Sequence, residues 1–500
     1  MHTILQERPR SDHAADAVQT LQPVPRLQSK SPHTAPQTAS PYLLAPLYER
    51  LSAHLPGAHD RAEAADFLQT AVTQCASQPD GLPDDPAALL GWMQAHVEKV
   101  HGQYQAYLET RKAGAPRRYF TNRAHALHFL RNVAPTKLVD GAWLYGLCAH
   151  ADNARLSDLV TTYVEELGDG QPEKNHVKLY RDLLARYGLD PVDDLPDSLY
   201  YHGLVQLALA WNAEDYLPEV IGFNLGYEQL PLHLLITAYE LNELGIDPYY
   251  FTLHVTVDNA DTGHAKRACT AALDAAPRID DRGEYWRRVR IGAQLGNLGV
   301  GTIEVIQGFD IDQEVVQIFA RKATAGNGAH SDFCKVAGRS VNDWLSDPDR
   351  MPEFLVALEQ AQWIKRDRPV TESRFWQLLQ GERGEMFGVF SPYELQVIHD
   401  WIRGKASVDG AAYDAASSPA ARTRPMSFRV AERLKAARGH RAEKGMGMGV
   451  GSLDTDLAIF EERYPTLQPA EQRALLMQAM SPALHWTPVG LLATRLFLQR

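Results

Sequence analysis

The segment HVTVDNADTGH, residues 254–264, contains two histidines and two aspartates but no lysine or arginine. If it is helical, His254, Asp258 and Asp261 share one face, because they are spaced by four and three residues, and His264 lies one turn further on. Two carboxylates on one face repel each other unless a cation lies between them. Imidazole and carboxylate are ligand types that suit iron. The segment therefore predicts a metal site; the alternative is that these residues only cap and solvate helix ends.

Further ligands would have to come from earlier in the chain, and EELGDGQPEKNH offers Glu166 and His176. Gly168 and Gly170 are expected to end one helix, and Pro172 is tolerated in the first turn of the next. Glu166 and His176 would then flank a helix junction and could point into the same bundle interior. Taken alone, Glu166 could also be an ordinary solvated helix residue.

A third acidic position is Glu228 in the segment PEVIGFNLGYEQLPLH. Apolar residues flank it, so if it faces inward it must be paired, protonated or bound to metal. Glu219 precedes it on a similar helical face. Either residue could instead be a surface carboxylate.

The elements that carry these residues are predicted to be helices. Apolar residues recur at spacings of three and four from Leu43 to about residue 290, and again from about 290 to 405. Short clusters of Gly, Pro, Asp and Asn separate the runs and suit helix ends. We find no run of alternating strands and no fixed repeat. The predicted fold class is all-α, a helix bundle.

Composition suggests five parts of the chain. The first part is rich in Pro, Ser, Gln, Thr and His, which predicts a disordered arm. A helical domain, a helical extension packing on it, a linker and a C-terminal helical hairpin are expected to follow. The extension could cap a pocket or mediate a homodimer. The five parts are residues 1–40, 41–290, 291–405, 406–452 and 453–500.

Net charge, cysteine content and hydropathy argue against several classes of protein. The formal net charge of −12 argues against a nucleic-acid partner, because phosphate contacts need clustered Lys and Arg. The four cysteines form no CxxC pair, so neither a disulfide framework nor a zinc knuckle is predicted. The N-terminus has no apolar signal core, and no window of about 18 apolar residues follows. We therefore expect a cytoplasmic protein with no membrane span.

Taken together, the three motifs resemble the haem-oxygenase-like diiron oxidases and oxygenases, also called iron-containing redox enzymes. Members of that family carry a Glu, Gly and His segment, a PE-x-x-G helix, and a terminal core helix with His, Asp and His. The same order occurs here between about residues 115 and 275. The resemblance implies a haem-oxygenase-like helical bundle, here with additional C-terminal helices. The family's iron ligands match Glu166, His176, His254, Asp258 and His264.

The terminal core helix departs from the family pattern in its spacing. The family spaces these ligands as HxxxDxxH, whereas His264 comes three residues later than that pattern places it. Asp258 and Asp261 are therefore rivals for the aspartate role. A bulge near Gly263 would restore the alignment, since π-bulges occur often at functional sites.

The first core helix departs from the pattern in its carboxylate. The family normally offers a glutamate there, but KLVDGAWLYGLCAH contains none, and Asp140 is the best-placed carboxylate by its spacing from Glu166. Some family members take a further glutamate from the helix that matches PEVIGFNLGYE. This makes Glu228 an additional ligand candidate.

The resemblance implies an enzyme that binds two Fe(II) ions per chain and uses O2 to oxidise a small metabolite. Known family reactions are N-oxygenation, desaturation and oxidative C–C cleavage of amino acids or fatty acids, and an external electron donor could be a further partner. One alternative is a metal-free or haem-binding member of the same fold. Another is a non-catalytic interaction protein that binds its partner through the basic stretch 423–444. Candidate axial haem ligands are His125, His128, His150 and His202.

Overall fold

The computed structural model of the chain describes most residues after the predicted N-terminal arm. Residues 43 to 500 belong to one unit by their internal contacts. The arm, the basic stretch 423–444, Asp258 and Asp261 lie outside the described residues. The described ranges are 43–53, 55–78, 81–189, 195–257, 263–279, 281–331, 333–381, 384–407 and 454–500.

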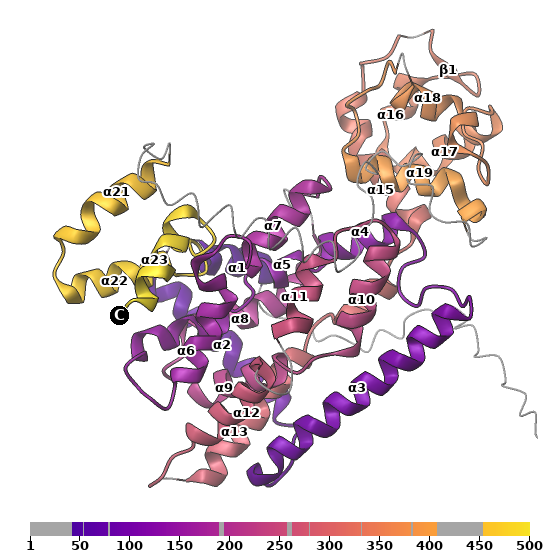
Figure 1. The fold of residues 1–500 in the computed structure, drawn as a ribbon. Coiled ribbons are helices and arrows are strands. Elements are labelled where there is room, and N and C mark those ends of the chain that lie inside the picture. The colour runs from indigo at the N-terminus through magenta and orange to yellow at the C-terminus, as the bar shows by residue number, and fades with distance from the viewer. Residues whose placement is uncertain are drawn as a thin grey trace, which may run out of the picture. The chain divides into compact units, whose positions relative to one another are not determined.

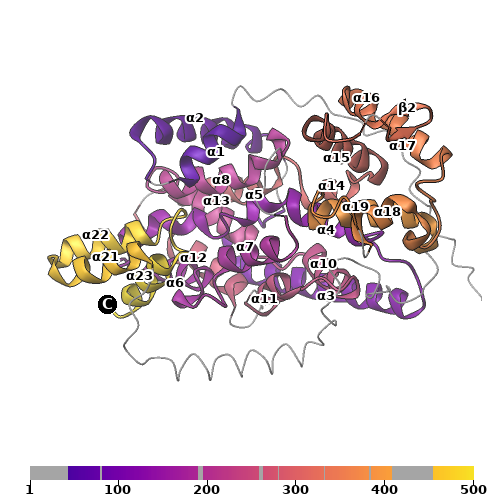
Figure 2. The same cartoon turned by 90° about the horizontal axis from the view of Figure 1, so that it is seen from above.

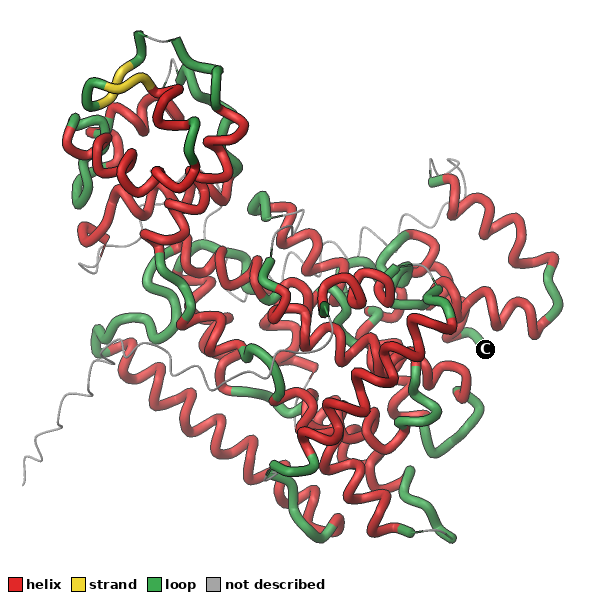
Figure 3. Tube along the Cα trace, turned by 180° about the vertical axis from the view of Figure 1, so that it is seen from behind, coloured by secondary structure: helices red, strands yellow, loops and turns green. Residues whose placement is uncertain are grey.

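Helices form nearly all of the regular structure in these ranges (Figure 3), so the predicted all-α fold is confirmed. The helices up to α13 are α1 (Leu44–Ser52), α2 (Ala58–Cys75), α3 (Leu89–Lys112), α4 (Arg123–Asn132), α5 (Ala134–Lys137), α6 (Ser157–Glu166), α7 (His176–Arg186), α8 (Tyr201–Trp211), α9 (Leu217–Tyr227), α10 (Leu232–Glu243), α11 (Tyr249–Val257), α12 (His264–Asp274) and α13 (Arg282–Gln294).

The second half of the chain continues the helical pattern. Its helices are α14 (Thr302–Gln307), α15 (Ile311–Gly326), α16 (Val341–Leu345), α17 (Met351–Gln360), α18 (Arg374–Gln380), α19 (Pro392–Arg403), α21 (Thr455–Arg463), α22 (Pro469–Ala479) and α23 (Pro488–Leu498). The C-terminal part expected as a helical hairpin thus contains three helices, α21 to α23, which lie together (Figure 1). None of the described helices is both long and apolar enough to cross a membrane.

Short 3-10 helices and one pair of strands complete the described structure. Strands β1 (Lys335–Val336) and β2 (Arg339–Ser340) form an antiparallel hairpin in which Lys335 pairs with Ser340. The 3-10 helices are η1 (Pro86–Ala88), η2 (Ala142–His150), η3 (Gly168–Gly170), η4 (Asp197–Tyr200), η5 (Leu295–Asn297), η6 (Pro348–Arg350), η7 (Val370–Glu372), η8 (Gly404–Ser407) and η9 (Tyr464–Thr466).

Buried apolar side chains form two clusters, and the helices with predicted ligands are divided between them. The first cluster takes side chains from α1, α2, α6, α8, α9, α12, α13 and the C-terminal helices. The second takes side chains from α4, α7, α10, α11 and the helices α15 to α19. Each large side chain that is fully buried contributes about 1.5–3 kcal/mol to folding. Helices α6, α9 and α12 therefore belong to one cluster, and α7 and α11 to the other.

Helices α9 and α13 touch backbone to backbone, and this contact fixes α9, which Glu228 follows directly (Figure 2 shows α13 among the central helices). A Cβ atom on Gly222 would lie 1.9 Å from the carbonyl oxygen of Val289. A Cβ atom on Gly292 would lie 2.3 Å from the carbonyl oxygen of Glu219. Only glycine at these two positions allows the helices to approach so closely.

We expect Gly222→Ala to lower the free energy of unfolding by about 2 kcal/mol or more, because the added methyl group forces α9 away from α13. Chemical denaturation measures the change. Gly102→Ala is the matched control, since Gly102 lies inside the exposed part of α3 with nothing within 4 Å of its added Cβ. That substitution should stabilise the protein by about 0.5–1 kcal/mol. Equal effects of the two substitutions would contradict the close packing of α9 on α13.

Candidate metal centre

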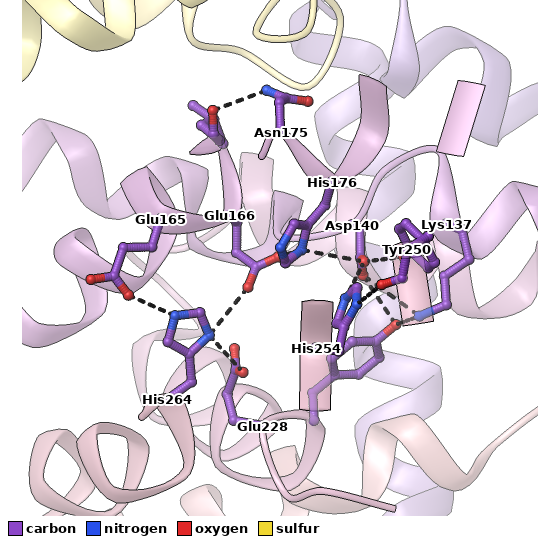
Figure 4. A network of polar contacts seen from close by, with 12 residues as sticks. Lys137, Asp140, Glu165, Glu166, Asn175, His176, Glu228, Tyr250, His254 and His264 are labelled. Atoms are coloured by element: carbon purple, nitrogen blue, oxygen red, sulfur yellow. Dashed lines mark hydrogen bonds and ion pairs between the residues drawn. The ribbon is translucent and has the colours of Figure 1, made fainter. Parts of the chain in front are cut away.

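Six of the predicted ligand residues meet in the interior, in two groups that share Glu166 (Figure 4). Within each group the candidate ligand atoms all lie within 4.8 Å of one another. All six side chains are buried. The first group is Asp140, Glu166, His176 and His254, and the second is Glu166, Glu228 and His264.

Helix ends supply most of these side chains. Glu166 is the last residue of α6 and His176 the first residue of α7, so both flank the glycine turn that the sequence predicts. Glu228 caps the C-terminus of α9, and His264 begins α12. Asp140 lies in the turn between α5 and η2. The ends of helices and the turns between them thus bring together residues that lie far apart along the chain.

The turn that carries Asp140 lies against Glu166 because its next residue is glycine. Gly141 has a φ of 81°, and a Cβ atom there would lie 2.8 Å from the Cβ atom of Glu166. A side chain at this position would be strained by its backbone conformation and would push Glu166 away. The dipeptide Asp140–Gly141 is therefore a structural requirement for the first group.

The hydrogen bonds of His254 call for a cation beside it. Its Nδ1 atom donates to the carbonyl oxygen of Tyr250 at 2.8 Å. In a neutral imidazole the other nitrogen is then an acceptor. That nitrogen, Nε2, lies 3.2 Å from a carboxylate oxygen of Asp140. Two acceptors face each other at this distance only if a proton or a metal ion lies between them.

His264 is arranged in the same way. Its Nε2 atom lies 2.7 Å from Glu165, to which it donates. Its Nδ1 atom lies 3.2 Å from Glu228 and 3.3 Å from Glu166, both carboxylates. A carboxylate that holds the far nitrogen of a histidine fixes the ring orientation of that histidine in metal sites.

Two buried atoms of the centre have no hydrogen-bond partner in the described structure. Nδ1 of His176 touches a carboxylate oxygen of Glu166, but not with the geometry of a hydrogen bond. Oε1 of Glu228 is likewise unpaired. Buried polar atoms are rarely left without a partner. The Oε1 atom of Glu228 in particular points to a group that would complete the site, and nitrogen and oxygen donors of this kind fit a divalent metal ion such as iron.

The paired charges shift the pKa values of the centre. Burial raises the pKa of Asp140, but Lys137 and His254 outweigh it and lower the pKa to about 2. Burial likewise opposes ionisation of Glu166, but His176 and His264 hold its pKa well below its ordinary value. Burial lowers the pKa of His264 and of His176, but the surrounding carboxylates reverse the effect and raise both. Without metal, pairing with these carboxylates therefore favours the protonated form of both histidines.

Several residues that hold the ligands were not predicted from the sequence. The hydroxyl groups of Tyr250 and Tyr227 both donate to Asp140. Lys137 lies 3.9 Å from the same carboxylate, one helical turn before it. Glu165, which holds His264, directly precedes Glu166. For Lys137 and Glu165 the short sequence distance was an available signal, but the tyrosines come from helices remote from Asp140 in sequence.

A cavity of about 510 Å³ opens onto the centre. Four of the candidate ligands form part of its wall, namely Asp140, Glu166, Glu228 and His254. Aromatic and aliphatic side chains make up much of the rest, and Lys137 adds a cation. Besides Oε1 of Glu228, three atoms of wall residues have no hydrogen-bond partner in the described structure: Nε2 of His202, Oε1 of Gln229 and Oγ1 of Thr237. The cavity can therefore take a ligand with both apolar and polar groups.

The remaining predictions for the terminal core helix have different outcomes. Asp258 and Asp261 lie outside the described residues, and their role as ligands stays a prediction. Helix α11 ends at Val257, and α12 begins at His264 after an extended Gly263. Gly263 itself is therefore not part of a bulged helix, and the residues directly before it, where the expected bulge would begin, lie outside the described residues.

Other residues considered from the sequence lie outside the two groups. Glu219 binds Arg288 at 2.7 and 2.6 Å, so it serves the α9–α13 contact. His125 bonds the carbonyl oxygen of Ile306 and is buried, whereas His150 is exposed beside Glu214. Of the four histidines considered as haem ligands, only His202 lines the cavity.

Comparison with known proteins supports the interpretation of these two groups as candidate iron ligands. Residues 127–297 match the family described as iron-containing redox enzymes. The matched segment contains all six residues of the two groups. This match confirms the resemblance to a haem-oxygenase-like family over these residues. Neither the comparison with curated proteins nor that with solved structures found a match.

We expect metal binding to release protons, because the carboxylates around His264 raise its pKa far enough to leave its ring protonated at neutral pH in the metal-free protein, and the pKa of His176 is raised as well. Their pairing stabilises the metal-free fold fully below the unfolded-state pKa of about 6.5 and is lost as pH rises through the raised values. Metal affinity should therefore rise between about pH 6 and pH 8. Calorimetry in buffers of different ionisation enthalpy measures the protons released. His264→Gln should release fewer, and binding without proton release would contradict this charge state.

Proposed function

We propose that this chain, whose residues 127–297 match the iron-containing redox enzymes, is a non-haem diiron oxidase or oxygenase. It would use O2 to oxidise a small metabolite such as an amino acid or a fatty acid derivative. N-oxygenation, desaturation and oxidative C–C cleavage are the reactions we consider. Turnover would also require an external electron donor.

The observation that carries the proposal is the position of Glu166 between two sets of ligand atoms. A single metal ion would need one such set. Here the carboxylate of Glu166 belongs to a set with two histidines on one side and a set with one histidine on the other. A carboxylate shared in this way suits a pair of ions, as in helical bundles that bind two irons through Glu and His.

The negative charge of the centre also favours two metal ions. Asp140, Glu166 and Glu228 are three buried carboxylates, and burying unpaired charge costs several kcal/mol for each ion. Two divalent cations would offset that charge and allow the histidines to bind as neutral imidazoles. When bound, iron would supply the electrons and the Lewis acidity needed to reduce O2.

The chain's own residues would position the ligands and the substrate. Tyr250 and Tyr227 hold Asp140 in place, and Glu165 does the same for His264. The cavity would hold the substrate against the centre and exclude water from it. Lys137 and the unpaired amide oxygen of Gln229 offer polar contacts to the charged or polar group of a metabolite.

The alternatives account less well for the centre. A haem protein needs one axial histidine and no cluster of carboxylates. A non-catalytic interaction protein would have no use for six buried ionisable side chains, since their burial stabilises the fold poorly compared with apolar residues of similar size. Neither alternative accounts for the buried Oε1 atom of Glu228, which has no hydrogen-bond partner in the described structure.

We expect an anaerobic titration to give two Fe(II) ions per chain for the unaltered protein and about one for His264→Ala, which removes a ligand from the second group only. Glu166→Ala should weaken both sites, because the shared carboxylate is lost. Asp182→Asn is the control, since Asp182 is exposed and pairs only with Lys178 at the surface in the described structure. Equal iron content in all four proteins would sink the proposal.

Rapid mixing of the Fe(II)-loaded protein with O2 is expected to give a transient visible absorbance band. His254→Ala should lose the band, because His254 belongs to the first group of ligands. Iron uptake with no reaction toward O2 would leave a metal protein that is not an oxidase. A band that persists unchanged in His254→Ala would show that the chemistry occurs elsewhere.

A further inference from the structure

The turn between the two ligands Glu166 and His176 has a left-handed backbone, which two of its residues adopt freely because they are glycines. The three residues of η3 all have positive φ values: 66° at Gly168, 54° at Asp169 and 73° at Gly170. Asp169 is the one residue of the turn with a side chain, and this region costs such a residue up to about 1–2 kcal/mol. Contacts from elsewhere in the fold help to hold the turn in this form.

Helix α23 supplies such contacts. A Cβ atom on Gly170 would lie 2.4 Å from the carbonyl oxygen of Leu491, so the turn and the helix touch through their backbones. Arg495, also in α23, donates to the carbonyl oxygen of Gly170 at 2.6 Å. Helix α23 is therefore in direct contact with the segment that joins Glu166 and His176.

Asn175 connects the turn to the C-terminal helices a second time. Its side chain is fully buried, and its Oδ1 atom caps α7 by accepting from the backbone N–H of Lys178 at 2.9 Å. Its Nδ2 atom donates to the carbonyl oxygen of Leu167 at 3.2 Å and lies 3.1 Å from Nδ1 of His485 (Figure 4 shows Asn175 beside the centre). The side-chain amide of Asn175, the residue before His176, thus contacts Leu167, which follows Glu166. The same amide contacts His485 in the loop between α22 and α23.

Further contacts bind the C-terminal helices to α6 and α7 on either side of the turn. The hydroxyl group of Tyr163 in α6 donates to the carbonyl oxygen of Met480 at 2.5 Å. The guanidinium group of Arg181 in α7 lies 4.0 Å from the ring centre of Trp486. Both helices that carry ligands are therefore held by the same C-terminal part of the chain.

We propose that residues 454–500 act as a clamp that sets the separation of Glu166 and His176, with Asn175 and His485 as positioning residues for the first group of ligands. The inference rests on the proposed metal centre. It goes beyond the family match, because the clamp lies outside residues 127–297. It also assigns a role to a part of the chain that does not line the cavity.

Titration of the full chain with Co(II), used alone as the probe, tests the clamp by affinity and by visible absorption spectrum. Asn175→Ser keeps a side chain that caps α7 but is too short to reach Leu167 and His485. His485→Phe keeps the ring and removes its nitrogen atoms. His176→Ala provides the spectrum of a centre without that ligand. Arg473→Gln is the control, because Arg473 joins the same C-terminal helices to Asp152 and Ala149, away from the turn.

We expect Asn175→Ser and His485→Phe to weaken Co(II) binding by about ten-fold or more, as loss of groups that orient metal ligands does. Their spectra should shift toward that of His176→Ala, while Arg473→Gln keeps the affinity and spectrum of the unaltered protein. If Asn175→Ser fails to fold, His485→Phe decides the question.

Three results would overturn the clamp in distinguishable ways. Absence of Co(II) and Fe(II) binding in the unaltered protein would overturn the proposed function and the clamp together. Normal binding by the unaltered protein and by both clamp variants would overturn the clamp alone. An equal loss in Arg473→Gln would show that any loosening of the C-terminal helices weakens the centre, which contradicts a specific role for Asn175 and His485.

Discussion

Burial of the Glu166 carboxylate is the constraint on which the rest of the structure depends. It lies where side chains from α6, α9 and α12 meet those from α7 and α11, which belong to different apolar clusters. An isolated carboxylate in such a place would be too costly to leave ionised. Histidines from both sides therefore converge on it, and their own shifted pKa values are a consequence of that convergence. The two clusters are thus joined by charge as well as by apolar contact.

Side chains can converge in this way only where the backbones of neighbouring segments lie close together. Three glycines around the centre allow such close contacts. Gly141 admits the side chain of Glu166, Gly170 admits α23, and Gly222 admits α13. Three ligands sit at helix ends that face the centre. Glu166 is the last residue of α6, and His176 and His264 are the first residues of α7 and α12.

The sequence predicted what depends on local pattern and missed what depends on contacts between distant segments. Apolar spacing of three and four predicted the helices. The three motifs predicted five of the six ligand candidates that the fold brings together, and the spacing from Glu166 predicted the sixth, Asp140. The extended backbone of Gly263, directly before the helix that begins at His264, was not predicted, since the spacing of ligands does not show where a helix begins. The link between Asn175 and His485 joins residues 310 positions apart, and no pattern along the chain could indicate it. The small β-hairpin was missed because strands of two residues carry no alternation to detect.

Different parts of the chain form the substrate cavity and hold the turn between two metal ligands. The wall of the cavity runs from Phe129 to Val305, nearly the same range as the family match, so the centre and its substrate space form one unit. Residues 454–500 contribute nothing to that wall, yet they touch the turn between two ligands. A change in the clamp should therefore alter metal affinity without reshaping the cavity, whereas a change at Thr237 or His202 should do the reverse. Because Glu166 lies both in the cavity wall and beside the clamped turn, it is the residue through which metal affinity and substrate fit would influence each other.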